Sequence, residues 1–154
     1  MIRRVVPLLL TVLVACGGGR PAPATPAPAS PADALAAFLD AARQNDRNRM
    51  GQLWGSERGP ASGWMEASEL NKRVSVIQAY LVHTGYRVVE GPMPIPGDSR
   101  RLTFRVELRR DDCVHVQPID VVRVDAGGWV VQDVHLGEAQ SPAQACTPGT
   151  GTPR

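Results

Sequence analysis

The sequence contains no apolar run long enough to cross a membrane. Its longest predominantly apolar stretch covers residues 5–15, which is 11 residues, whereas a membrane-spanning helix needs about 20. The stretch also contains Pro7, which the interior of a folded helix tolerates poorly. Two arginines precede it and an alanine ends it, as in a secretory signal peptide. We therefore expect residues 1–15 to be removed and the remaining chain to work outside the cytoplasm.

Lysine and net charge are also scarce. Lys72 is the single lysine among 17 basic residues, and the sequence has 15 acidic residues. Loss of Arg3 and Arg4 with the leader leaves 15 basic and 15 acidic residues, so the mature chain has no formal net charge. A nucleic-acid-binding domain is expected to keep a basic stripe. We therefore expect no nucleic acid among the partners of this protein.

Motifs for metals and nucleotides are missing as well. The three histidines and three cysteines include no HxxxH or CxxC spacing. The sequence has no nucleophile elbow and no phosphate-binding glycine loop. We therefore expect neither a metal ion nor a cofactor.

The leader ends in Leu13, Val14, Ala15 and Cys16. These four residues resemble the lipobox of bacterial lipoproteins, in which the leader is cut immediately before the cysteine. The resemblance implies that Cys16 carries three acyl chains, more than the two signals that stable anchoring needs. An ordinary secretory signal with an incidental cysteine is the alternative.

The residues after Cys16 bear on the membrane to which the protein is sorted. In the lipoprotein family an aspartate at this place commonly marks retention in the inner membrane, whereas Gly17 and Gly18 stand here. The resemblance therefore implies a lipid-anchored protein of the cell envelope. In a host with two membranes it would lie on the outer membrane and face the periplasm.

Two further cysteines, Cys113 and Cys146, form an even pair. Disulfides persist outside the cytoplasm, so the pair favours a bridge. A Cys113–Cys146 disulfide would close a loop of about 34 residues and contribute roughly 3–4 kcal/mol in the chain-entropy model. Two free thiols are the alternative.

The chain divides into an extended spacer, one domain and a tail. Residues 16–30 comprise Cys16 and a linker rich in Pro, Ala and Gly, which is typical of a semi-rigid spacer. Residues 31–140 have the patterning of one folded domain. Residues 141–154 are expected to be a partly disordered tail.

Helical periodicity comes first in the domain. A first helix is predicted to start at Ser30 and Pro31, a good N-cap followed by a good first helical residue. Its apolar residues form one stripe that is expected to be buried: Leu35, Phe38, Leu39 and Ala42. A short second helix is predicted after Asp46, and residues 55–65 have the composition of a loop. A third helix is predicted over residues 66–83, because apolar residues recur at spacings of three and four.

Alternation of apolar and polar residues follows. It predicts strands over residues 86–90, 101–110, 113–124 and 129–136, with a proline-rich loop at 91–99. Pro118 marks an edge position or a bulge. Helices are expected to cover the apolar face of this sheet. The sequence therefore predicts an α+β fold with three N-terminal helices packed on a curved antiparallel sheet of about four strands.

Three segments carry a resemblance to a known fold family: DALAAFLDAARQND, HTGYRVVEG and DAGGWVVQDVHL. Over about residues 31–138 the chain resembles the nuclear transport factor 2-like superfamily of the cystatin-like group. The resemblance implies a cone of three helices and a strongly curved sheet, with a pocket inside. It also implies that Asp, His and Tyr residues within the cone can serve enzymes of the superfamily.

Residues of those types give one candidate acid–base pair. Asp133 and His135 are two positions apart on a strand and share a face with Trp129 and Val131. If that face lines a pocket, the pair could perform general acid–base chemistry; if it faces solvent, it is an ordinary polar surface. The full set of candidates is Tyr80, His83, Tyr86, His115, Asp133 and His135.

Three functions follow from these observations. The leading hypothesis is a non-catalytic, envelope-anchored domain that holds a small apolar ligand in the cone or docks an envelope protein on the sheet. The second is a pocket enzyme of isomerase or hydratase type that uses Asp133 and His135. The third is a structural assembly factor of the cell envelope, with the sheet as a homodimer face. The direction of the Asp133 and His135 side chains distinguishes the first two.

Overall fold

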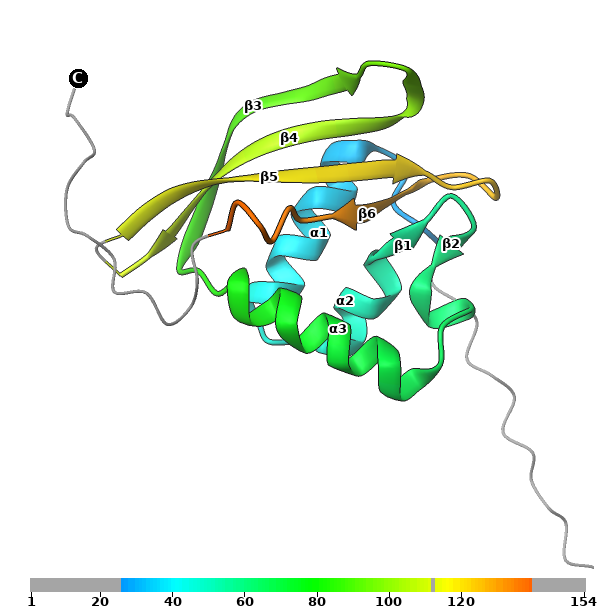
Figure 1. Ribbon diagram of the computed structural model, residues 1–154, viewed down its shortest axis with the longest axis horizontal. Helices are drawn as coiled ribbons and strands as arrows, with labels where there is room; N and C mark the ends of the chain where they lie inside the picture. The colour runs from blue at the N-terminus through cyan, green and yellow to red at the C-terminus, as the bar shows by residue number, and fades with distance from the viewer. Residues whose placement is uncertain (1–25, 112, 140–154) are drawn as a thin grey trace, which may run out of the picture.

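The computed structural model describes residues 26–111 and 113–139. These residues form three α-helices on one side of a four-stranded antiparallel sheet, together with a two-stranded hairpin (Figure 1). The predicted α+β class is confirmed. The elements are α1 (Pro31–Arg43), α2 (Arg47–Leu53), β1 (Gly55–Ser56), β2 (Gly59–Pro60), the 3-10 turn η1 (Ala61–Gly63), α3 (Ala67–Tyr80), β3 (Gly85–Ile95), β4 (Asp98–Arg110), β5 (Cys113–Arg123) and β6 (Trp129–Asp133).

The large sheet is a meander in the order β3-β4-β5-β6. The alternation on β4 buries Phe104, Val106 and Leu108 against the helices, each at 2% exposure or less. Strand β6 pairs only with residues 120–123 of β5, so the first part of β5 has β4 as its one strand neighbour among the described residues. Pro118 lies in that part, as the prediction of an edge position requires.

The first two helices begin where the sequence predicts. The Ser30 hydroxyl oxygen accepts a hydrogen bond from the Asp33 backbone N–H at 3.1 Å, and a proline opens α1. The Asp46 carboxylate accepts a hydrogen bond from the Arg49 N–H at 2.9 Å and caps α2. The predicted apolar stripe of α1 is buried in the core, at Leu35, Phe38, Leu39 and Ala42.

The expected block of three consecutive helices is wrong, because the hairpin of β1 and β2 lies between α2 and α3. Residues 55–65, expected to be a loop, contain this hairpin and η1. Gly59 has a φ of +117°, which turns the chain back. The Glu57 carbonyl accepts a hydrogen bond from the Asp125 N–H at 2.8 Å. This hydrogen bond joins the hairpin to the distant β5–β6 turn. The loop prediction was wrong because local composition gives no information on a contact between segments so far apart.

The predicted loop at 91–99 is also largely wrong, because β3 extends to Ile95 and β4 begins at Asp98. Pro92 and Pro94 fit in β3 because it is an edge strand of the sheet. A proline lacks the N–H that a second strand neighbour would need, and an edge strand has one neighbour only.

The third helix and the last strand end earlier than predicted. Helix α3 ends at Tyr80, where the Arg110 guanidinium donates hydrogen bonds to carbonyls of the last turn and to that of Val82. Strand β6 ends at Asp133, since His135 has a φ of +43° and turns the chain away from β5. The positions at which α3 and β6 end are thus set by Arg110 and His135, which the periodicity of each element does not take into account.

The end of the linker packs on the sheet face opposite the helices. Ala27 contacts the buried valines of β5 and β6 on that face, and the Pro28 carbonyl accepts a hydrogen bond from the Trp129 N–H at 2.9 Å. The segment that follows the predicted membrane anchor therefore joins the domain at the β5–β6 turn.

Candidate functional site

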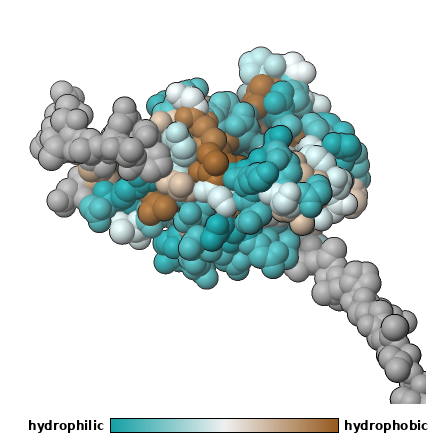
Figure 2. Space-filling view, turned by 60° about the horizontal axis from the view of Figure 1, so that its bottom comes forward, coloured by the Kyte–Doolittle hydropathy of each residue, from teal (hydrophilic) through white to brown (hydrophobic). Residues whose placement is uncertain are grey.

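An apolar groove of about 290 Å³ lies between α3 and the chain that leaves β6. Figure 2 shows apolar side chains gathered on this face of the molecule. Most of the lining is hydrocarbon, and polar groups are few. The groove is lined by Trp54, Arg73, Val76, Ile77, Gln132, Asp133, Val134 and Leu136.

The groove exists because α3 packs on α2 and η1 and leaves part of its apolar surface uncovered. Val74 and Ile77 are buried, whereas Val76 on the same helix is 50% exposed. Across the groove, Val134 is buried and Leu136 is half-buried against the core. Val76 lies off the buried face of α3 and stays exposed, and together with Leu136 it borders a site for an apolar molecule.

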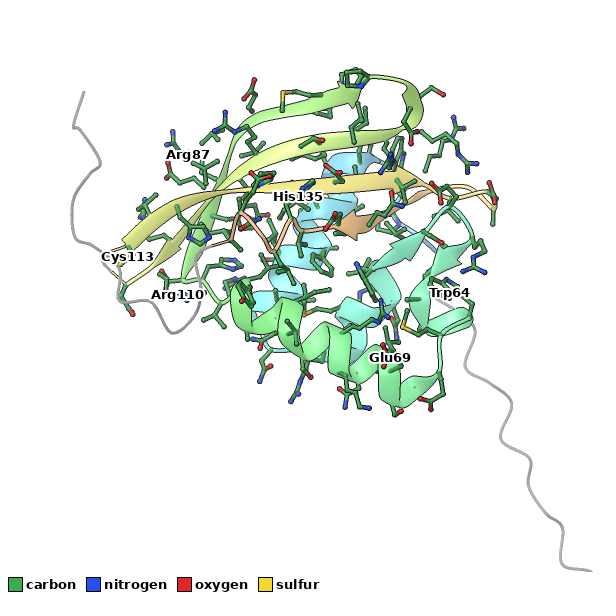
Figure 3. All side chains as sticks on the ribbon, viewed as in Figure 1. Trp64, Glu69, Arg87, Arg110, Cys113 and His135 are labelled. Carbon is green, nitrogen blue, oxygen red and sulfur yellow. The ribbon has the colours of Figure 1, made fainter. Side chains whose placement is uncertain are left out.

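Two charged side chains stand at the groove, and both have partners within the domain. The Arg73 Nε donates to the Glu69 carboxylate at 2.7 Å, one turn earlier on α3. The Asp133 Oδ1 accepts a hydrogen bond from the His135 backbone N–H at 2.9 Å. Figure 3 shows Glu69 on α3 and His135 beside β5. The charges at the groove are thus already engaged.

The structure does not bring the side chains of Asp133 and His135 together as an acid–base pair. Asp133 lines the groove and bonds to the backbone of His135, whereas the His135 ring contacts Asp120. The enzyme alternative requires both side chains at one reacting group. The two candidates instead have different neighbours.

The ring of His135 belongs to a polar cluster that the sequence analysis missed. Its Nε2 lies 3.1 Å from Oδ2 of Asp120, although the N–H direction is not aligned for a hydrogen bond. Oδ1 of Asp120 accepts a hydrogen bond from the Thr103 hydroxyl at 2.6 Å. Asp120 is only 4% exposed. The sequence carried no signal for this burial, because a polar residue between Ile119 and Val121 in a strand is expected on the solvent face.

Gln117 holds the segment that forms one wall of the groove. It is fully buried, and its Nε2 donates hydrogen bonds to the Val134 carbonyl at 2.5 Å and to the His135 carbonyl at 3.3 Å. This amide takes the place of backbone pairing where β6 separates from β5. The sequence analysis did not identify Gln117, because its contacts are with carbonyls 17 and 18 residues later in the chain.

The remaining candidates lie outside the groove. The Nδ1 of His83 donates a hydrogen bond to the Leu81 carbonyl at 2.7 Å, and the ring meets Tyr86 edge-on at 5.7 Å. Burial lowers the pKa of His83 and of His115, and burial raises the pKa of Tyr86. The Tyr80 carbonyl accepts a hydrogen bond from Arg110 at 3.0 Å. Structural roles account for these contacts.

The cysteine predictions fall mainly outside the described residues. Cys113 opens β5 and is disulfide-bonded. Both Cys146, its predicted partner, and the predicted lipidation site Cys16 lie outside the described residues. The pairing with Cys146 and the lipidation stay predictions.

Comparisons with known proteins gave no match: no family model, no curated protein and no solved structure is similar to this chain. Within residues 26–111 and 113–139, no helix is long and apolar enough to span a membrane. The same residues contain no group of three or more His, Cys, Asp or Glu side chains that could hold a metal ion.

Proposed function

We propose that this chain is a lipid-anchored envelope protein whose domain binds a small apolar ligand without converting it chemically. The observation that carries the proposal is the groove of about 290 Å³ between α3 and residues 132–136. Ligand pockets typically measure about 300–1,000 Å³ and are mainly apolar with a few polar groups. The groove is just below the lower limit of this range and has such a lining.

The exposed apolar surface of the groove favours a ligand-binding role over a packing defect without function. Val76 keeps 50% of its surface exposed at the groove, beside the half-buried Trp54 and Leu136. Covering exposed apolar surface yields about 25 cal/mol for each Å² removed from water. Binding of an apolar molecule in the groove would therefore be favourable and would stabilise the folded domain.

The proposal includes the membrane anchor and the fold family. Leu13, Val14, Ala15 and Cys16 support lipidation at Cys16, and three acyl chains would suffice for stable attachment. Helices on one side of an antiparallel sheet are compatible with a nuclear transport factor 2-like cone. In that arrangement, too, a ligand would lie between helices and sheet.

Native mass spectrometry of the chain isolated from its host tests ligand binding. We expect a retained small molecule on the wild-type protein. Val76→Phe fills the groove from an exposed position and should remove the molecule. Val114→Phe is the matched control, because Val114 is 53% exposed on the opposite face of the sheet and does not line the groove. A wild-type protein without any bound molecule, or a molecule that Val76→Phe retains, would contradict the proposal.

Metabolic labelling with palmitate tests the anchor separately. The wild-type chain should incorporate the label and remain with membranes, and Cys16→Ser should do neither. Label in the Cys16→Ser chain, or an unlabelled wild-type chain, would remove the envelope part of the proposal while leaving the groove experiment valid.

A further inference from the structure

We propose that Trp64 and Arg58 form a membrane-contact site, through which the domain docks on the phospholipid surface that holds its anchor. This inference goes beyond the groove and rests on the envelope part of the proposed function. It follows from the exposure of Trp64, from the stacking of Arg58 on it, and from the place where the linker joins the domain.

Trp64 is the one exposed aromatic side chain in the described part of the chain. Its exposed fraction is 41%, whereas Trp54 and Trp129 are half-buried against the core. Trp64 belongs to residues 60–65, a tip that contains no charged residue. Tryptophan is enriched where membranes meet water, because the indole joins a large apolar body to one polar N–H. The tip is therefore suited to the headgroup boundary of a membrane.

Hydrogen bonds within the domain hold the Trp64 indole in place. The Trp64 Nε1–H donates to the Gly59 carbonyl at 3.1 Å, and the Met65 backbone N–H donates to the Ala61 carbonyl at 2.8 Å. The polar group of the indole is thus satisfied inside the protein. Covering the ring with lipid breaks no hydrogen bond between this N–H and water, so the contact gains from apolar burial without that cost.

Arg58 supplies a cation beside the exposed ring. Its Cζ lies 4.4 Å from the centroid of the Trp64 ring. The side chain is exposed and forms no ion pair within the described residues. A guanidinium that stacks on an aromatic ring keeps its N–H donors, and their planar fork matches the oxygens of a phosphate. Arg58 can therefore bind a lipid phosphate while Trp64 enters the apolar side of the same boundary.

The linker joins the domain at the same end of the molecule. Ala27 packs on the valine cluster that contains Val124, and a Cβ built on Gly59 would lie 3.7 Å from Cγ1 of Val124. Gly59 in turn accepts the hydrogen bond of the Trp64 indole. Figure 3 shows Trp64 at the end of the molecule opposite Cys113. The end that faces the anchor thus carries the contact site.

The length of the chain before this point keeps the domain near the membrane. Nine residues, 17–25, separate Cys16 from Pro26. The fully extended chain from Cys16 to Pro26 spans at most about 36 Å. A lipid on Cys16 would therefore hold the tip at a high effective concentration relative to the surface, and even a weak contact would then be populated.

The charges that border the tip favour a local contact over a general attraction to anionic lipid. They are one cation, Arg58, and two carboxylates, Glu57 and Glu66. Glu66 is engaged at the start of α3, where its carboxylate accepts hydrogen bonds from the Ser68 and Glu69 N–H groups at 2.8 and 3.1 Å. Zwitterionic phosphatidylcholine, which carries a phosphate and no net charge, should therefore suffice for docking.

Quenching of tryptophan fluorescence by brominated lipid tests this inference. The chain from Gly17 to Arg154 carries an N-terminal hexahistidine tag in place of Cys16, and a nickel-chelating lipid holds it on phosphatidylcholine vesicles. This attachment does not depend on lipidation of Cys16. Compared with the same vesicles without bromine, brominated acyl chains should remove up to about one third of the emission, since Trp64 is one of three tryptophans.

Variants assign the quenching to the two residues. Trp64→Phe should abolish it, whereas the matched control Trp129→Phe should retain it, because Trp129 is half-buried against the core. Arg58→Gln should reduce the quenched fraction by about half, because the phosphate contact is lost. Arg109→Gln is its control and should change nothing, since Arg109 is exposed opposite Val114, at the other end of the sheet.

The outcomes separate this inference from the proposed function. Equal emission of the wild-type chain on brominated and ordinary vesicles overturns the contact site, whatever palmitate labelling shows for Cys16. Quenching that persists in Trp64→Phe also overturns it, because another surface would then meet the lipid. Equal quenching of wild type and Arg58→Gln overturns the role of Arg58. The comparison of the two kinds of vesicle on the wild-type chain needs no variant to fold.

Discussion

Oδ2 of Asp120 on β5 lies 3.1 Å from Nε2 of His135, which follows two residues after β6 ends at Asp133. The other carboxylate oxygen of Asp120 accepts a hydrogen bond from Thr103 on β4. One buried carboxylate thus connects β4, β5 and the chain that forms a wall of the groove. This connection links one wall of the groove to the sheet.

Asp120→Ala should destabilise the protein by about 1–3 kcal/mol, because it leaves the Thr103 hydroxyl and His135 without a buried partner. Urea unfolding measures the loss. Asp125→Ala is the control, since the Asp125 side chain is 64% exposed in its pair with Arg100. An exposed pair contributes less than about 1 kcal/mol. Equal losses in the two variants would show that the Asp120 cluster has no structural role.

Acid should destabilise the protein before its surface carboxylates titrate. Burial lowers the pKa of His83 and His115 in the folded state, whereas unfolded histidines titrate near about 6.5. The unfolded state therefore binds more protons below that pH, and stability that is complete above it is lost as the pH falls through the folded pKa values. Urea unfolding from about pH 7.5 down to about pH 5.5 should show this decline.

One variant controls this pH dependence. His83→Phe removes one titrating ring, so the decline should become shallower. Hydrogen bonds lower the pKa of Glu66, Asp98 and Glu107. These carboxyl groups are therefore protonated only at a pH below the range in which the histidines titrate. Stability that does not change over the histidine range would contradict the prediction.

Gly128→Ala should destabilise the domain more than Gly127→Ala does. Both glycines have positive φ values, +83° and +97°, so both alanines incur similar backbone strain. A Cβ on Gly128 would also lie 2.8 Å from the Ala27 Cβ and 2.9 Å from the Pro28 carbonyl oxygen, whereas nothing lies within 4 Å of one on Gly127. Such overpacking costs about 1–3 kcal/mol.

Thermal or urea unfolding of the two glycine variants measures this difference. A truncated chain that begins after residue 28 lacks the crowding contact, so the two variants should be equally stable in that background. Equal stability in the longer chain would mean that the end of the linker does not pack on the β5–β6 turn.

Peptide mapping without reduction should recover Cys113 joined to Cys146. Reduction, or Cys146→Ser, should then lower the free energy of unfolding by roughly 3–4 kcal/mol, because the unfolded chain regains the entropy of an open loop of about 34 residues. Recovery of Cys113 joined to Cys16 would disprove this pairing and also the lipidation of Cys16, since one sulfur cannot form both bonds.

Local patterns allowed much of the fold to be predicted. The caps at Ser30 and Asp46, the buried stripe of α1 and the alternation on β4 are confirmed, because each depends on residues within a few positions of one another. The predicted loop at 91–99 is wrong for the opposite reason. Whether a proline can occupy a strand depends on the number of its neighbours in the sheet, which local composition does not show.

The candidate site divides in a similar way. Asp133 was identified from the sequence and lines the groove, but it bonds to the backbone of His135 and not to the ring, as the enzyme alternative would need. The bulge at Gln132 and the turn at His135 redirect the side chains of this segment. A shift of one residue in strand pairing changes which face a side chain occupies, and a single strand's sequence does not reveal that shift.

By itself, the sequence determined the α+β class, the helix starts at Ser30 and Asp46, and the apolar face of β4, because these follow from hydrogen bonding and periodicity within short segments. Only the tertiary structure decided that Asp120 meets His135 and that Gln132 lines the groove. Those relationships depend on how distant segments pack and pair, and the free energy of that packing belongs to the whole fold.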